Sequence, residues 1–244
     1  MIALETKNLS KRFNGVHAVD HVSLVVSRGA ITSIIGPNGS GKTTLLNLLT
    51  GIVANNSGSI IISSSIELNQ IKPWIIASHS ITRTFQEVRL FNQMSVLDNI
   101  LVTLTKREIS RSLFETSQKQ SFDRAKEVLL KVDLWDKRYE LAINLSYGQR
   151  KLLEIARVLA MNSNLILLDE PFAGLFPQII KKVVAIIKEL KQAGIAIVLI
   201  EHNMNLIREL SDKVIVMDEG KILAEGEVEK VLNQRTVIEA YLGD

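Results

Sequence analysis

In this chain of 244 residues, a strand pattern is followed at once by a glycine-rich loop and a leucine-rich helix pattern. Residues Ile31–Ile35 alternate in the manner of a strand, and the loop GPNGSGKT comes next. The leucines between residues 45 and 49 then follow the spacing of a buried helix, which Gly51 ends. The sequence therefore predicts the order strand, glycine loop, helix.

The loop Gly36–Thr43 matches G-x-x-x-x-G-K-[ST] in the strand-to-helix setting that this pattern requires. Glycines let backbone N–H groups converge on phosphate oxygens, and a helix N-terminus adds the positive end of its dipole. We expect Lys42 to reach the β- and γ-phosphates of a nucleotide and Thr43 to offer its hydroxyl to Mg²⁺. The structural alternative is a glycine turn beside a surface lysine. The residues expected to bind nucleotide here are Gly36, Pro37, Asn38, Gly39, Ser40, Gly41, Lys42, Thr43 and Thr44.

The remaining hydrophobic pattern predicts an α/β fold with an inserted helical part. Leu165–Leu168 and Ile195–Ile200 are continuous apolar runs, typical of a parallel sheet that is covered on both faces. From Ser95 to about Met161 the apolar spacing is helical, which predicts an inserted helical subdomain. The other expected elements are strands at 4–9, 18–26, 58–62 and 81–86, a hairpin at 213–217 and 221–224, and helices at about 147–160, 177–192, 227–232 and 237–242.

Composition excludes several classes of protein. The chain has no cysteine, so disulfides, thiolate metal sites and a cysteine nucleophile are excluded. No stretch approaches the roughly 20 apolar residues of a membrane span, and the N-terminus lacks the pattern of a signal peptide. The net charge is +3, no run of five like charges occurs, and aromatic residues make up only 5%. We therefore expect no nucleic-acid partner.

Acidic residues and a histidine follow the apolar runs of the expected parallel sheet. Asp169 and Glu170 end the first run, where Asp169 is expected to hold Mg²⁺ through water and Glu170 to polarise an attacking water. An acidic pair that starts a turn before Pro171 is the alternative. His202 follows the second run and is expected at the same edge of the sheet, where it would hydrogen-bond the γ-phosphate. A purely structural histidine fits this position equally well.

These motifs, in their order and spacing, resemble the ATP-binding cassette (ABC) proteins. The supporting strings are the glycine loop, TRTFQ at 82–86, LSYGQ at 145–149, LILLDEP at 165–171, and His202. LSYGQ separates this family from other phosphate-loop ATPases. The resemblance covers essentially the whole chain, so it implies one ABC ATP-binding domain over residues 1–244. It also implies a phosphate-loop ATPase core with an N-terminal antiparallel β-subdomain and a helical subdomain at about residues 90–160.

The resemblance implies roles for further residues. Phe13 resembles the aromatic residue that stacks on adenine, although a core phenylalanine is the alternative. Gln86 resembles the glutamine that contacts Mg²⁺ and the water and moves with a transmembrane partner. Ser146, Gly148 and Gln149 resemble the signature that binds the γ-phosphate of ATP held by the opposite subunit, although Ser146 alone would be an ordinary helix cap. The expected catalytic residues are Glu170, His202 and Lys42, and the expected metal-binding residues are Thr43, Gln86 and Asp169.

The resemblance also implies partners and a cellular role. Two cassettes, identical or different, would close face to face around ATP and Mg²⁺, because each site needs the other chain's signature. The match looks closest to ATPase subunits of branched-chain amino acid importers, which implies transmembrane permease subunits, a solute-binding protein and a place at the cytoplasmic face of the membrane. The alternatives are a soluble cassette ATPase acting on nucleic acid or ribosomes, the ATPase of a lipid or lipopolysaccharide exporter, and a regulatory partner that binds ATP without turnover.

The sequence departs from the family pattern at a few positions. Phe176 stands where Asp or Asn is expected to bridge to the other subunit's phosphate loop, so it either packs at the dimer seam or weakens the coupling of the two sites. Tyr147 stands where the commoner signature has Gly. The stretch Ser63–Ser80 is rich in serine and isoleucine and is expected to be irregular.

Overall fold

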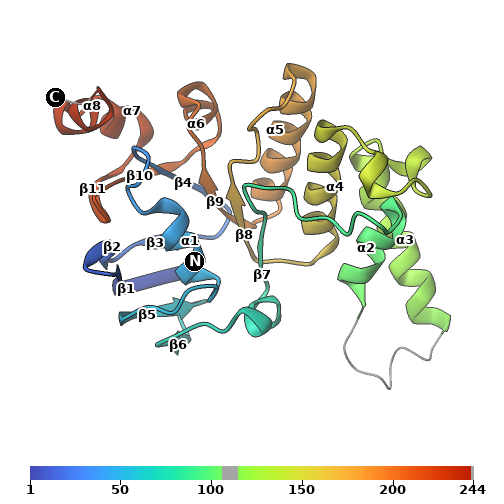
Figure 1. Cartoon of the computed structure of the whole chain (residues 1–244), viewed down its shortest axis with the longest axis horizontal. Helices are drawn as coiled ribbons and strands as arrows, with labels where there is room; N and C mark the ends of the chain where they lie inside the picture. Colours follow the sequence, from blue (N-terminus) through green and yellow to red (C-terminus); the bar gives the residue numbers. More distant parts are fainter. Residues whose placement is uncertain (106–114, 243–244) are drawn as a thin grey trace. The chain divides into compact units, whose positions relative to one another are not determined.

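The chain forms two compact units in the computed structural model, which describes residues 1–105 and 115–242 (Figure 1). The first unit comprises Met1–Arg83, Asn164–Pro171 and Ile186–Asp244 and holds both β-sheets. The second comprises Thr84–Ser163 and Phe172–Ala185. Residues 106–114 of the expected helical region, and the last two residues of the chain, lie outside the described residues.

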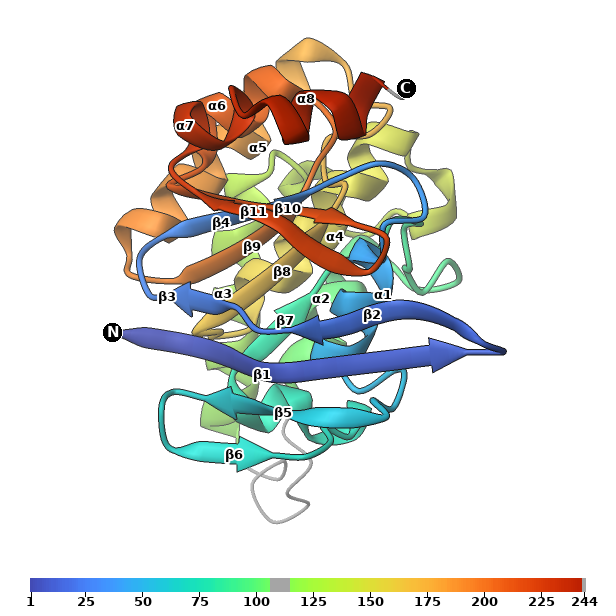
Figure 2. The same ribbon diagram turned by 90° about the vertical axis from the view of Figure 1, so that its left-hand side faces the viewer.

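The larger sheet of the first unit is mainly parallel, as the apolar runs predict. Its strand order is β11-β10-β4-β9-β8-β7, and all neighbouring pairs run parallel except the terminal hairpin β10–β11 (Figure 2). The parallel order places the ends of β4, β8 and β9 at one edge, where the loops with predicted functions begin. The strands are β4 Ile31–Ile35, β7 Ile81–Arg83, β8 Leu165–Asp169, β9 Ala196–Ile200, β10 Lys213–Asp218 and β11 Lys221–Gly226.

The smaller sheet is antiparallel, which confirms the expected N-terminal β-subdomain. Its order is β2-β1-β5-β6, and β3 also pairs with β1. The sequence pattern missed β6, which forms a hairpin with β5 through Ser63 and Ser64 at φ values of 51° and 58°. Glycine or asparagine usually occupies such positions, so the turn carried no composition signal. The strands are β1 Ile2–Phe13, β2 Val16–Val22, β3 Val25–Ser27, β5 Ser57–Ile62 and β6 Ile66–Leu68, and a 3₁₀ helix η1 follows at Pro73–His79.

The period of two along each central strand divides the apolar side chains of the first unit between two cores. Ile34 and Met217 belong to the core that also contains the leucines of α1 (Lys42–Leu49) and residues of the antiparallel sheet. Ile35 and Val216 face the other way, into a core that contains Ile207 of α6. Both faces of the sheet are therefore buried. The helices of the second core are α6 Met204–Leu210, α7 Val228–Leu232 and α8 Arg235–Leu242.

The second unit is helical over its described residues. Its long helices bury the apolar face that the sequence predicted, including Ile100, Leu129 and Leu153. It begins at Thr84, earlier than the expected residue 90, and it also takes the first half of α5. Within residues 1–105 and 115–242, none of the helices combines the length and the apolar composition that a membrane crossing requires. The elements are α2 Val96–Leu104, α3 Glu115–Lys131, η2 Trp135–Lys137, η3 Ala142–Asn144, α4 Tyr147–Ala160 and α5 Pro177–Gln192, the last shared with the first unit.

Candidate nucleotide site

The glycine loop joins β4 to α1, and at Gly36 and Gly41 its backbone lies too close to neighbouring backbone atoms for a side chain. Gly36 has φ 149°, and a Cβ there would lie 2.0 Å from the carbonyl oxygen of Met217. Gly41 has φ 99°, and a Cβ there would lie 2.2 Å from the carbonyl oxygen of Ala18. A Cβ at Gly39 would meet no atom within 4 Å, so the loop is open on that side. Glycine is therefore required at both ends of the loop, while its middle is accessible to an anion.

Lys42 is buried beneath this loop, so the alternative of a surface lysine is wrong. Its ammonium donates to the carbonyl oxygens of Gly36 and Pro37, at 2.8 Å each. Burial lowers the pKa of Lys42, and the negative charges of Glu170 and Asp169 act in the opposite direction. The loop thus holds a positive charge close to two carboxylates.

Glu170 and His202 meet at the carboxyl edge of the parallel sheet, as their positions after the apolar runs predict. Glu170 has φ 49°, and its N–H donates to the carbonyl oxygen of Ile200 at 3.0 Å, which ties the end of β8 to the end of β9. Nε2 of His202 lies 3.1 Å from Oε1 of Glu170. His202 is 42% exposed, so the pair is open to solvent and to a ligand.

Glu201, which the sequence reasoning missed, orders the backbone next to His202. Its Oε1 accepts from the N–H groups of His202 and Asn203, at 3.0 and 3.1 Å. Burial raises the pKa of Glu201. Asn203 in turn caps α6, because its Oδ1 accepts from Asn205 N–H at 3.0 Å. The histidine therefore sits on a backbone that hydrogen bonds hold on both sides.

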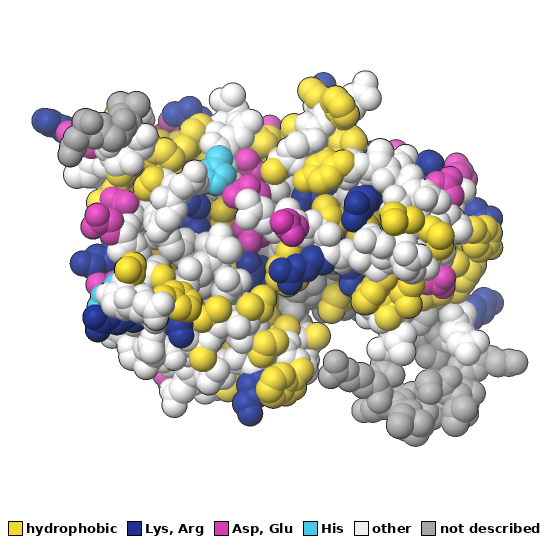
Figure 3. Space-filling view, in the orientation of Figure 1, with side chains coloured by type: hydrophobic (Ala, Val, Ile, Leu, Met, Phe, Trp, Pro, Cys, Tyr) yellow, Lys and Arg dark blue, Asp and Glu magenta, His cyan; other side chains and the backbone are white. Residues whose placement is uncertain are grey.

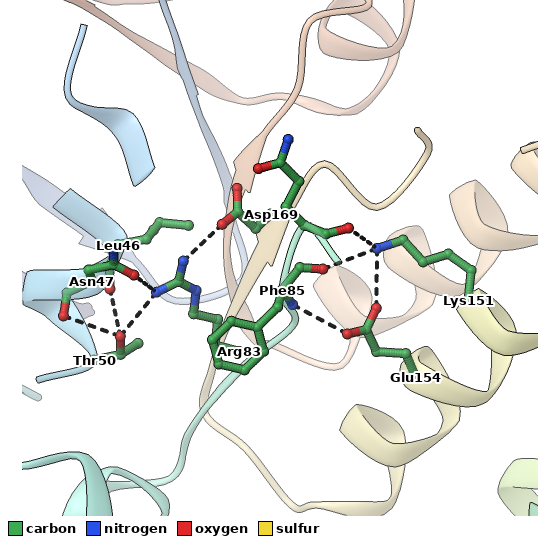
Figure 4. A network of polar contacts seen from close by, with 9 residues as sticks. Leu46, Asn47, Thr50, Arg83, Phe85, Lys151, Glu154 and Asp169 are labelled. Atoms are coloured by element: carbon green, nitrogen blue, oxygen red, sulfur yellow. Dashed lines mark hydrogen bonds and ion pairs between the residues drawn. The ribbon is translucent and has the colours of Figure 1, made fainter. Parts of the chain in front are cut away.

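Arg83 is a second residue that the sequence did not single out. Its Nη2 donates to Oδ2 of Asp169 at 2.8 Å, and both side chains are buried (Figure 4). Its Nη1 donates to Oδ1 of Asn47 at 2.7 Å and to the hydroxyl of Thr50 at 3.2 Å. Both of these acceptors belong to α1 and the residue that ends it.

In the helical unit, a buried ion pair holds the backbone at Gln86. Lys151 Nζ donates to the carbonyl oxygens of Phe85 and Gln86, at 3.2 and 3.4 Å, and lies 3.2 Å from Oε2 of Glu154 (Figure 4). The other oxygen of Glu154 accepts from Phe85 N–H. Burial raises the pKa of Glu154, while the charge of Lys151 lowers it. Lys151 and Glu154 belong to α4, so this helix fixes the backbone of the Gln86 segment.

The LSYGQ motif forms the N-terminus of α4. The Ser146 hydroxyl accepts from Gln149 N–H, and the Gln149 side chain accepts from Ser146 N–H, which together form a capping box. A Cβ at Gly148 would lie 2.4 Å from Cδ1 of Ile179, so a larger residue there would require the Ile179 side chain of α5 to shift. Tyr147, the departure from the common signature, donates its hydroxyl to the carbonyl oxygen of Ala173 at 3.3 Å.

Two phenylalanines that the sequence singled out are exposed. Phe13 ends β1 with 44% exposure and has the ammonium of Lys11 at 4.9 Å from its ring centroid, so the alternative of a core residue is wrong. Phe176 is 77% exposed and directly precedes α5. Its carbonyl oxygen accepts from the N–H groups of Ile179 and Ile180 at 2.9 and 3.1 Å.

The donor set of the first unit suits a nucleotide with a magnesium ion. The Thr43 hydroxyl and the Asp169 carboxylate are oxygen donors, which Mg²⁺ prefers, and Lys42 supplies a charge for phosphate. Within the described residues, no group of three or more His, Cys, Asp or Glu side chains gathers as a protein-only metal site. Mg²⁺ shared with phosphates needs few protein ligands, so the residues present fit this ion.

A parallel sheet with a glycine phosphate loop and two carboxylates at its edge defines a nucleotide-binding protein of the phosphate-loop class. Comparison with known proteins narrows this class. The family model described as "ABC transporter" matches residues 19–173, and the chain belongs to the ABC transporter family. It is an ATP-binding, ATP-hydrolysing enzyme of the transport-coupled type.

Relatives and solved structures match over nearly the full length. The chain is 38% identical over 250 residues to the high-affinity branched-chain amino acid transport ATP-binding protein LivG of Salmonella typhimurium, covering 99% of this chain and 98% of LivG. It is 34% identical to the lipopolysaccharide export system ATP-binding protein LptB of Escherichia coli, covering 100% and 98%. The ADP conformation of an ATP-binding cassette of an ABC transporter matches with a TM-score of 0.86 and 34% identity over 100% of both chains. A dimeric cassette bound to ADP and Pi matches with a TM-score of 0.80 and 26% identity, covering 92% of this chain and 98% of that one.

Proposed function

We propose that this chain is the ATPase subunit of an importer that takes up branched-chain amino acids or a related small polar solute. The observation that carries the proposal is the 38% identity to LivG over 99% of this chain. The subunit works at the cytoplasmic face of the membrane with transmembrane permease subunits and a solute-binding protein. Its two compact units act as one ATP-binding domain over residues 1–244.

The proposed nucleotide contacts come mainly from the glycine loop. Lys42 binds the β- and γ-phosphates, and the backbone N–H groups of residues 38–44 surround the phosphate oxygens. The support is the accessible middle of the loop and the charge held beneath it. Phe13 stacks on the adenine, which its exposed ring permits.

Hydrolysis requires a base and an ordered water. Glu170 accepts the proton of the attacking water, and His202 orients Glu170 through the 3.1 Å contact and hydrogen-bonds the γ-phosphate. Thr43, Asp169 and Gln86 are the residues that would hold Mg²⁺. When bound with the nucleotide, this ion offsets negative charge on the phosphates.

We propose that two chains, either identical or related, share each nucleotide. Ser146, Gly148 and Gln149 would bind the γ-phosphate held by the other chain, because they lie at the N-terminus of a long helix and helix N-termini attract anions. A dimeric ABC cassette 26% identical to this chain supports the arrangement. Phe176 would then lie at the seam between the two chains.

The helical unit offers a surface for the permease. Phe91, Leu141 and Ile143 are 47%, 40% and 50% exposed. Backbone bonds from Ile143 N–H to Asn92 and from Ala142 N–H to Met94 hold the two segments side by side. Figure 3 shows apolar side chains at the surface among side chains of both charges. Exposed apolar residues of this kind suit a protein partner.

A second candidate, lipopolysaccharide export, is favoured by the 34% identity to LptB over the whole chain. Amino acid import and lipopolysaccharide export differ in the membrane proteins that would contact the exposed apolar residues of the helical unit, and in the substrate that is transported.

Purification of the tagged chain from detergent-solubilised membranes, with identification of the associated proteins, tests the proposal. We expect permease subunits with a solute-binding protein, and loss of this complex when Ile143 becomes Asp. The matched control Leu130→Asp alters a residue of the same unit that is 52% exposed and lies outside the proposed surface. Lipopolysaccharide export components would favour the second candidate, and ribosomal or DNA-associated partners alone would defeat both.

A further inference from the structure

The side chain of Arg83 contacts β8 and α1, the two elements of the first unit that carry the predicted metal-binding residues Asp169 and Thr43. It is the last residue of β7 and pairs with Leu167 of β8, two residues before Asp169. Its side chain is 5% exposed and that of Asp169 is 2% exposed. The contact between them is therefore shielded from solvent and from screening by salt.

The guanidinium contacts Asp169 with one nitrogen and α1 with the other (Figure 4). The α1 contacts are Asn47 and Thr50, which are three residues apart and so share one face of the helix. The Thr50 hydroxyl donates to the carbonyl oxygen of Leu46 at 2.8 Å, which leaves its lone pairs for Arg83. Helix α1 begins with Lys42 and Thr43, so the same rigid element carries Arg83's acceptors and the predicted phosphate and metal contacts.

Arginine is suited to such a bridge. Its planar guanidinium is always charged and presents several donors in a fixed geometry, whereas a lysine ammonium is a single point on a flexible stem. Charge-assisted hydrogen bonds to a carboxylate are also shorter and stronger than neutral ones. Arg83 thus compensates the buried charge of Asp169 and fixes the direction of its carboxylate at the same time.

We propose that Arg83 is a positioning residue of the nucleotide site, which holds the Asp169 carboxylate in a fixed place relative to α1 and thereby sets how strongly Mg²⁺ enhances nucleotide binding. The proposal rests on the proposed role of Asp169 toward Mg²⁺. Residues that orient a metal ligand affect metal affinity without touching the metal. Nucleotide binding without Mg²⁺ uses the loop and Lys42 and not Asp169, so we expect the exchange Arg83→Lys to leave it unchanged.

The test compares dissociation constants of a fluorescent, non-hydrolysable ATP analogue in Mg²⁺ and in EDTA, using the full chain. Complete removal of the arginine charge would leave Asp169 buried without this counter-charge and would compromise folding. The informative variants are therefore Arg83→Lys, which keeps the charge, and Asn47→Ala, which removes one brace and leaves Arg83 and Asp169 in place. The matched control is Arg28→Lys, the same exchange at an exposed position of the same unit.

We expect the enhancement by Mg²⁺ to fall on the order of ten-fold in Arg83→Lys. A smaller fall is expected in Asn47→Ala and none in Arg28→Lys, with the dissociation constant in EDTA unchanged in all three. Mn²⁺ affinity of the analogue complex, measured by electron paramagnetic resonance, should fall in the same order. An unchanged enhancement in Arg83→Lys, or an equal loss in Mg²⁺ and in EDTA, overturns the positioning role. If the wild-type chain itself shows no enhancement, the proposed Mg²⁺–nucleotide site fails and the inference fails with it.

Discussion

Replacing Phe176 by Asp should stabilise the chain, although aspartate there adds a charge and removes an apolar ring. Phe176 occupies the position before Pro177, the first residue of α5, and its ring is 77% exposed. A phenylalanine side chain has no acceptor for the first N–H groups of the helix, whereas an aspartate carboxylate has two oxygens. The exposed ring contributes little burial that the exchange would lose.

The size of this stabilisation follows from the capping of α5 and from its helix dipole. An aspartate at the N-cap contributes about 1 kcal/mol relative to a residue that does not cap. Its charge beside the positive end of the helix dipole adds roughly 0.5 kcal/mol at low salt. The two contributions together are about 1.5 kcal/mol. For a chain of this size, about 1 kcal/mol raises the midpoint of thermal unfolding by roughly 3 °C, so the expected gain is about 4.5 °C.

Thermal unfolding of the isolated chain measures this gain, with Phe176→Ala as the control for loss of the ring and Phe176→Asn for a cap without charge. The expected order of melting temperature is Asp above Asn, and Asn above Ala. High salt should narrow the difference between Asp and Asn, because it screens the dipole term. An Asp variant no more stable than the Ala variant would refute the capping argument. A separate ATPase measurement on the assembled complex, in which we expect Phe176→Asp to raise activity, tests whether the ring weakens coupling between sites.

Three further predictions follow from the site. Glu170→Gln should keep ATP binding, reduce single-turnover hydrolysis by about 100-fold or more and accumulate a dimer with ATP by light scattering; unchanged hydrolysis would remove Glu170 as the base. Burial raises the pKa of Glu201 in the folded state above its ordinary 4.5. At pH values between 4.5 and this raised pKa, the folded state binds more protons than the unfolded state, so the free energy of unfolding falls as pH rises through that range. Glu201→Gln keeps the Oε1 acceptor without the charge. Its free energy of unfolding, relative to that of the wild type, should therefore increase with pH in this range. A difference between the two free energies that does not change with pH would contradict a pKa raised by burial. Gly41→Ala should abolish nucleotide binding and destabilise the chain more than Gly194→Ala, because both have positive φ but only Gly41 has a carbonyl oxygen 2.2 Å from the added Cβ.

The main elements of the fold were predictable because their signals are local. The apolar runs became β8 and β9, the terminal hairpin formed as β10 and β11, and α5 spans the predicted residues 177–192. The structure of residues 63–80 could not be predicted in this way, because its turn uses Ser63 and Ser64 at positive φ and its strand β6 is only three residues long. Such features depend on pairing with β5 and leave little trace in composition.

Some residues of the candidate site could likewise be predicted from local sequence motifs, and others could not. The glycine loop, Glu170 and His202 could be found from motifs because each follows a recognisable strand. Arg83 and Asp169 are 86 residues apart in the sequence, so nothing local indicates their contact. Lys151 and Glu154 have the spacing of an ordinary exposed helix pair, yet both are buried. Buried polar contacts of this kind are created by tertiary packing and must be seen in a structure.

Uptake of labelled leucine into proteoliposomes that contain the purified complex, measured together with phosphate release, tests whether this chain powers import of a small polar solute. We expect ATP-dependent uptake that rises with phosphate release, the loss of both in Lys42→Ala, and neither change in Lys7→Ala, an exposed lysine of the same unit. Phosphate release that continues without movement of leucine or of any related small polar solute would contradict this role.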